Sequence, residues 1–198
     1  SNLMTLDDWK YVVDHMADMK MNQLVVSVYG CWCVQYDGRV SEYMYVPIEK
    51  YPKLRTPVIE RYYSPSKAKW IDKERLPPMF EEDFFGELIA YGKVRGVTVF
   101  PLVNSYGHNT LIPAMYPEVS ALDKDGNPSL TGFCISNPKT YKLLLHIYDE
   151  LIDKYLLPNN IHSFHIGLDE VWDGLGHNSE DLFKERSPWC KCSECSKY

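Results

Sequence analysis

Apolar residues along this chain follow two patterns that alternate from one end to the other. Apolar positions that recur every three or four residues predict helices over residues 6–20, 81–95 and 137–155. Continuous apolar runs rich in β-branched residues predict buried strands over residues 23–29, 97–103 and 161–167. Because each strand follows a helix, the order predicts an α/β fold with a parallel sheet.

Residues that favour helix ends support these helices. Thr5 is placed to cap the first helix, with Asp8 as the capping-box acid. Gly96 ends the second helix, and Asn137 caps the third. The third helix is predicted to bury one stripe, which comprises Tyr141, Leu144, Leu145, Tyr148, Leu151, Ile152 and Tyr155.

Residues 31–78 show no such pattern. They contain many aromatic residues and six prolines, and a structureless stretch of this length is uncommon in a compact domain. Two interpretations stay open, namely short elements that the pattern does not reveal or a functional loop over a site.

The composition is that of a globular protein. The chain has 198 residues, of which 45% are hydrophobic, so it carries enough apolar material for a core. A net charge of −6 without a Lys/Arg cluster argues against a nucleic-acid partner. No apolar run is long enough to cross a membrane, and the N-terminus lacks the layout of a signal peptide. Residues 1–2, Ser-Asn, look like the scar left by removal of an expression tag.

Polar residues cluster where the predicted strands end. Residues 30–33, 104–108 and 169–170 each follow a strand. Parallel α/β folds form their sites at the carboxyl ends of strands, so this convergence predicts an enzyme.

Asp169 and Glu170 are two adjacent carboxylic acids at the last of these strand ends. Where the backbone turns, both side chains can reach one pocket, and different environments can divide acid and base roles between them. The alternative is that Asp169 caps a turn and Glu170 is solvated.

Four segments resemble glycoside hydrolase family 20, the β-N-acetylhexosaminidases. Residues 165–170 read His-Ile-Gly-Leu-Asp-Glu, which is similar to the family's His-x-Gly-Gly-Asp-Glu. Residues 100–108 read Phe-Pro-Leu-Val-Asn-Ser-Tyr-Gly-His, which resembles Ile-Pro-Glu-Ile-Asp-x-Pro-Gly-His. Residues 20–22, Lys-Met-Asn, and residues 91–96, Tyr-Gly-Lys-Val-Arg-Gly, resemble the lead-ins to strands 2 and 3.

This resemblance implies part of a TIM (β/α)8 barrel, with strands 2–4 and their helices in residues 3–198 and a Cys-rich loop at 186–198. A complete barrel needs about 250 residues, so we expect this chain alone to have little or no activity. Exposed sheet edges then favour self-association.

The resemblance also implies a reaction. Terminal β-linked GlcNAc or GalNAc is removed by substrate-assisted retaining catalysis, which needs no cofactor. Glu170 is the implied general acid and base, and Asp169 the residue that orients the acetamido group. His108 and Asn104 border the sugar, whereas His165 orients its neighbours from inside the barrel.

Three aromatic residues near strand ends, Trp32, Tyr106 and Trp172, are candidates for stacking on the sugar. The alternative is packing in the core. Leu102, Asn104 and Leu168 depart from the family motifs, and these departures leave open a non-catalytic carbohydrate-binding relative.

Cys190, Cys192 and Cys195 form a cluster that suits a structural Zn²⁺. The fourth ligand is left open between His177, Cys31, Cys33 and a residue beyond this chain. Cys134 is expected to serve only in packing. Alternatives are unligated cysteines, or a zinc-stabilised structural module as the function of the whole chain. Bunched cysteines favour the cytoplasm over secretion.

Overall fold

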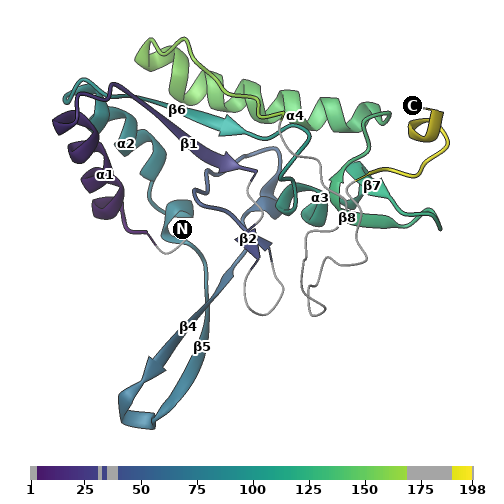
Figure 1. Ribbon diagram of the computed structural model, residues 1–198, viewed down its shortest axis with the longest axis horizontal. Coiled ribbons are helices and arrows are strands. Elements are labelled where there is room, and N and C mark those ends of the chain that lie inside the picture. The colour runs from purple at the N-terminus through teal and green to yellow at the C-terminus, as the bar shows by residue number, and fades with distance from the viewer. Residues whose placement is uncertain (1–3, 31–32, 35–39, 169–188, 198) are drawn as a thin grey trace.

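The computed structural model describes residues 4–30, 33–34, 40–168 and 189–197 (Figure 1). Its centre is a parallel pair of strands, β1 (Gln23–Tyr29) and β6 (Thr98–Val103). The segment that follows helix α4 (Pro138–Leu151) joins this pair through a parallel bridge between Leu102 and His165. Three parallel segments therefore stand side by side in chain order, which confirms the predicted α/β fold and its strand direction. The strand predicted over residues 161–167 is wrong in extent, since the structure has only this bridge there.

Helix α1 (Leu6–Asp18) begins at the predicted capping box. The backbone N–H of Asp8 donates to Thr5 Oγ1 over 3.2 Å, and the backbone N–H of Thr5 donates to Asp8 Oδ2 over 2.7 Å. These backbone and side-chain hydrogen bonds from Thr5 lower the pKa of Asp8. The helix ends two residues earlier than predicted because Lys20 takes a left-handed conformation, with φ +62°.

Helices α2 (Phe84–Lys93) and α4 are shorter than predicted. Gly96, with φ +72°, lies in the turn that follows α2, as predicted. Beyond Leu151 the chain continues as a π-helix over Ile152–Leu156. The predicted stripe of α4 is partly wrong, since Tyr141 and Leu145 are exposed. The buried face instead comprises Thr140, Leu143, Leu144, Ile147 and Leu151.

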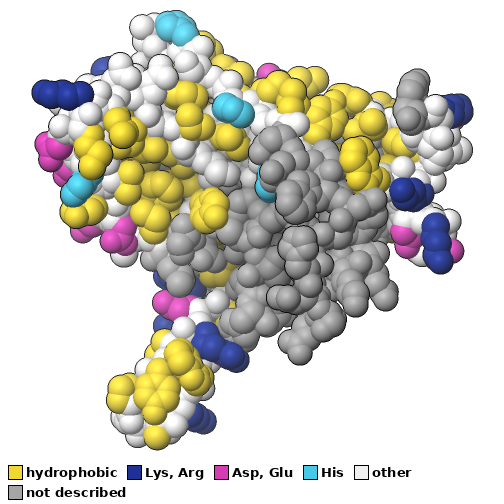
Figure 2. Space-filling model, in the orientation of Figure 1, with side chains coloured by type: hydrophobic (Ala, Val, Ile, Leu, Met, Phe, Trp, Pro, Cys, Tyr) yellow, Lys and Arg dark blue, Asp and Glu magenta, His cyan; other side chains and the backbone are white. Residues whose placement is uncertain are grey.

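Among the described residues, three antiparallel strand pairs interrupt the alternation of strand and helix, two in residues 31–78 and one between β6 and α4. In residues 31–78, β4 (Val58–Ser64) pairs antiparallel with β5 (Lys69–Arg75), and β2 (Cys33–Val34) pairs with β3 (Val40–Ser41). The β4–β5 hairpin projects from the body, and exposed aromatic residues gather on it (Figures 1 and 2). Between β6 and α4 lie α3 (Leu111–Met115), β7 (Ser120–Leu122) and β8 (Pro128–Phe133). Short elements thus account for much of the region that showed no sequence pattern.

The core lies between the parallel strands and the helices. Val26 and Val28 of β1, Val99 of β6 and Leu88 of α2 are almost completely buried. Within the part of the chain that the structure describes, no helix is both long and apolar enough to cross a bilayer.

Candidate active site

The carboxyl ends of the three parallel segments meet at one edge of the sheet. The backbone N–H of Asn104, just after β6, donates to Tyr29 O of β1 over 2.9 Å. The next N–H, that of Ser105, donates to Ile166 O over 3.1 Å and to Gly167 O over 2.8 Å. Residues 104 and 105 therefore tie the end of the first segment to the end of the third.

Asn104 is wedged between the backbones of the two neighbouring segments. Its side chain is 4% exposed, and Nδ2 donates to Gly30 O over 2.6 Å. Gly30 and Gly167 have φ values of +123° and +43°, and a Cβ built on either residue would overlap with Asn104. Glycine is therefore required at both positions, for conformation and for space. Asn104 Oδ1 has no hydrogen-bond partner among the described residues.

Ser105 contributes a side chain that the sequence did not single out. Its Oγ donates to Ile166 O over 2.6 Å and contacts the hydroxyl of Tyr148 on α4. Burial raises the pKa of Tyr148, so this phenol stays protonated as a hydrogen-bond donor or acceptor. The position of Ser105, directly after Asn104 in the family-like motif, was the signal that could have identified it.

Glu42 is a second residue that the sequence did not reveal. Its carboxylate lies at the end of β1, is 1% exposed and accepts the N–H of Gly30 over 3.1 Å. Burial, followed by the nearby charge of Glu42, raises the pKa of Tyr29 well above its ordinary value. No local pattern marks Glu42, because it follows its partner Gly30 by 12 residues, a separation that neither helical nor strand periodicity connects.

The loop after Asn104 carries Tyr106 and His108. Tyr106 is 37% exposed. His108 is partly buried in a left-handed conformation, with φ +53°. Exposure at this edge is compatible with the predicted contact between these side chains and a sugar, which stays a prediction.

His165 lies on the third segment at the same edge. Its side chain is exposed, and Nδ1 accepts the N–H of Gly167 over 3.0 Å. A neutral imidazole in this arrangement carries its proton on Nε2. His165 therefore fixes the backbone two residues further on, and its role inside the barrel stays a prediction.

Four of the predicted site residues lie outside the described residues, namely Trp32, Asp169, Glu170 and Trp172. The description ends at Leu168, directly before the acid pair. Asn104, Ser105 and His165 therefore hold the last backbone that leads into Asp169.

A pocket lies at the opposite edge of the sheet. It is lined by Thr98 at the start of β6, by Val97 just before it and by Asn160 before the third segment. Parallel α/β barrels do not form their active sites at the amino ends of strands. We therefore assign the candidate active site to the carboxyl edge.

Cys134 is buried, as expected for a packing residue, but it also lies next to the predicted cysteine cluster. Its Sγ lies in one cluster with those of Cys190, Cys192 and Cys195, and all four sulfurs are within 4.8 Å of one another. Sequence reasoning missed Cys134 because it precedes the other three by more than fifty residues. His177, Cys31 and the side chain of Cys33, the other fourth-ligand candidates, lie outside the described residues.

Comparison with known proteins places this geometry in a family. The family model described as glycosyl hydrolase family 20, catalytic domain, matches residues 2–198. A beta-hexosaminidase of Akkermansia muciniphila is 29% identical over 171 residues, which is 83% of this chain and 31% of that protein. Beta-hexosaminidase subunit A1 of Dictyostelium discoideum is 32% identical over 48% of this chain and 18% of that protein. The chain thus spans less than a third of the length of these relatives.

Solved structures of beta-N-acetylhexosaminidases are similar to this chain as well. A beta-N-acetylhexosaminidase structure superposes with a TM-score of 0.55 at 27% identity, over 84% of this chain and 33% of that one. A beta-N-acetylhexosaminidase from Bacteroides fragilis has the same fold, with a TM-score of 0.59 at 19% identity over 98% of this chain and 32% of that one. Because the family model matches residues 2–198 of the chain, this chain belongs to glycosyl hydrolase family 20.

Proposed function

We propose that the protein hydrolyses terminal β-linked N-acetylhexosamine residues by substrate-assisted retaining catalysis. The proposal rests on family membership and on one structural observation. Ser105, Asn104 and His165 fix the backbone of residues 165–167, directly before Asp169 and Glu170. Support of this kind gives a defined position to the backbone that leads toward the two acids at the carboxyl edge of a parallel sheet.

The three parallel segments are, in this proposal, strands 2, 3 and 4 of a (β/α)8 barrel. Their chain order, their parallel pairing and the polar residues at their carboxyl ends support the assignment. The remaining strands would complete the sugar pocket, since substrate sites of such barrels draw on loops from several strands.

The reaction divides two roles between neighbouring acids. The carbonyl oxygen of the substrate's 2-acetamido group bonds to the anomeric carbon while the glycosidic C–O bond breaks. Glu170 gives its proton to the leaving oxygen. Asp169 accepts the acetamido N–H and stabilises the positive charge that develops on that group.

Water completes the reaction. The carboxylate of Glu170 removes a proton from water, whose oxygen bonds to the anomeric carbon as the oxazolinium ring opens. Two displacements at one carbon retain its configuration. No protein nucleophile is needed, which is why the two acids can be adjacent, and no metal takes part.

Hydrolysis of a chitobiose-type disaccharide and of a nitrophenyl N-acetyl-β-hexosaminide by a protein with the complete barrel tests this proposal. Glu170→Gln should lower kcat by about 100-fold or more on the disaccharide and by less on the nitrophenyl substrate, whose leaving group needs no proton. A matched nitrophenyl β-glucoside, which lacks the acetamido group, should not be turned over.

Glu87→Gln is the matched control, because Glu87 is exposed on α2, away from the carboxyl edge. Equal activity of Glu170→Gln and Glu87→Gln on the disaccharide would disprove the role of Glu170. We expect the 198-residue chain by itself to show little turnover.

A non-catalytic sugar-binding protein is the second candidate. The observation that favours it is Asn104, which stands where the family motif has an acid and whose amide is bound to Gly30 O. Binding of N-acetylhexosamine by the complete barrel, with no hydrolysis of either acetamido substrate, would support this candidate over the enzyme.

A further inference from the structure

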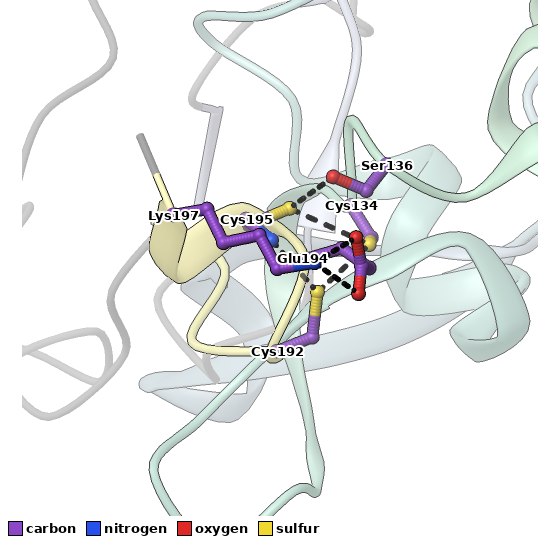
Figure 3. A network of polar contacts seen from close by, with 6 residues as sticks. All are labelled: Cys134, Ser136, Cys192, Glu194, Cys195 and Lys197. Carbon is purple, nitrogen blue, oxygen red and sulfur yellow. Dashed lines mark hydrogen bonds and ion pairs between the residues drawn. The ribbon is translucent and has the colours of Figure 1, made fainter.

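Four cysteine sulfurs from two distant parts of the chain converge at one point. Cys134 follows β8, whereas Cys190, Cys192 and Cys195 belong to the described segment 189–197. Cys134 Sγ lies 3.8 Å from Cys192 Sγ and 3.9 Å from Cys195 Sγ, although these residues are 58 and 61 positions apart (Figure 3). All four sulfurs lie within 4.8 Å of one another.

These distances fit a shared metal ion and not a disulfide. A disulfide bond brings two sulfurs to about 2.05 Å. Four thiolates at about 2.3 Å from a tetrahedral Zn²⁺ are about 3.8 Å apart, which matches the observed spacing of Cys134 to its neighbours. We propose that Cys134, Cys190, Cys192 and Cys195 bind one structural Zn²⁺.

Backbone N–H groups point at the sulfurs. Leu122 N donates to Cys190 Sγ over 3.3 Å, and Cys195 N donates to Cys192 Sγ over 3.4 Å. Such donors stabilise thiolate, the form that binds metal. The N–H of Cys195 is the main reason that the pKa of Cys192 falls to about 7.

The cluster otherwise disfavours several negative charges. Burial first, and then neighbouring thiol groups, raise the pKa of Cys134. Lys197 is bound to Glu194, with Nζ–Oε distances of 2.7 and 2.8 Å, so its charge is already paired (Figure 3). A divalent cation at the centre would compensate the thiolate charges that the backbone donors favour.

Four sulfur ligands leave no open position for water or substrate. This arrangement is that of a structural and not a catalytic zinc. Tetrahedral sulfur coordination at this spacing selects zinc or a single iron over hard cations such as Mg²⁺.

The zinc would attach the segment after the acid pair to the base of the β7–β8 hairpin. The backbone N–H of Lys191 already donates to Leu122 O of β7 over 2.7 Å. The ion would therefore close a loop of 190 − 134 = 56 residues between Cys134 and Cys190 that contains the predicted acids.

Cys134 lies shortly before α4, where Thr140 Oγ1 donates to Cys134 O over 2.8 Å. The hydroxyl of Tyr141 on α4 donates to Ile135 O over 2.6 Å, so α4 holds the backbone directly after Cys134.

Metal analysis of the full chain, purified under reducing conditions, tests the proposal. We expect about one zinc per chain. Cys134→Ser should remove most of the zinc, whereas the matched control Cys33→Ser should retain it. If Cys33→Ser loses the zinc and Cys134→Ser keeps it, Cys134 is not a ligand and the proposal fails.

A second measurement does not depend on the folding of any variant. Metal-free wild-type chain titrated with Co²⁺ should develop sulfur-to-cobalt charge-transfer absorption and the strong visible bands of tetrahedral cobalt, which added Zn²⁺ abolishes. Disulfides found by mass spectrometry, bound iron in place of zinc, or the absence of these cobalt bands would each overturn the proposal.

Discussion

Asn104 occupies the space above Gly167 so closely that the Cβ of any other residue at position 167 would overlap with Asn104 Oδ1. Nδ2 of the same side chain is bonded to Gly30 O. One buried amide thus sets the spacing of the segments on either side of β6, immediately before the predicted acid pair.

Gly167→Ala should destabilise the chain strongly. Gly126→Ala is the matched control, because Gly126 also has a positive φ, +83°, but a Cβ there meets nothing within 4 Å. The control should cost about 1 kcal/mol in free energy of unfolding through backbone strain alone. The overlap at position 167 should add about 1–3 kcal/mol. Urea denaturation measures both variants, and equal losses would contradict the close packing.

Asn104→Asp should make the free energy of unfolding decrease as pH rises. Most acids in folded proteins have the opposite effect, because their contribution is lost as pH falls. A buried carboxylate beside Gly30 O is repelled unless it is protonated, so burial raises its pKa in the folded state. The folded protein then binds the proton more tightly than the unfolded chain. Stability is therefore kept at low pH and lost as pH rises above the ordinary Asp pKa of about 3.9.

Thermal unfolding across this pH range measures that effect relative to wild type. Asn104→Ala is the control, because it also removes the bond to Gly30 O but introduces no titrating group. Parallel pH curves for the two variants would show that position 104 is solvated and not buried.

Asp14→Asn should weaken the contact between α1 and α2. Asp14 accepts the hydroxyl of Tyr91 over 3.0 Å and is also paired with Arg95. Desolvation raises the pKa of Asp14, but hydrogen bonds from Arg95 and Tyr91 outweigh it and lower the pKa below its ordinary value of 3.8. The contribution to stability is thus present above pH 3.8 and lost as pH falls through the folded-state pKa.

The difference in free energy of unfolding between wild type and Asp14→Asn should therefore be larger at neutral pH than well below pH 3.8. Asp18→Asn, exposed on the same helix, serves as the control. A difference that does not change with pH would refute the assigned charge contacts.

Phe85→Ala should cost about 3–5 kcal/mol in free energy of unfolding. Phe85 is 1% exposed and packs edge-on against Tyr155, with ring centroids 5.0 Å apart. Trp70→Ala, on the projecting hairpin, removes a larger side chain that is 64% exposed. This control should cost less than about 1 kcal/mol. Chemical denaturation distinguishes the two, and similar costs would mean that α2 does not face the core as described.

The sequence by itself determined the three long helices, the parallel segments between them and their order. The capping box of Thr5 and Asp8, the turn at Gly96 and the strand at residues 23–29 are each encoded within a few neighbouring residues. The same local information brought polar residues to the strand ends and carried the family motif through Asp169 and Glu170.

Tertiary structure alone decided the contacts between distant residues. Asn104 between two glycines, Glu42 at the N–H of Gly30, and Cys134 among the C-terminal cysteines each join segments that no periodicity connects. Secondary-structure propensity and hydrophobic periodicity depend on residues that are close in the sequence. Which distant groups meet depends on how the helices and strands pack, and here packing made a presumed core cysteine the fourth member of a proposed metal site.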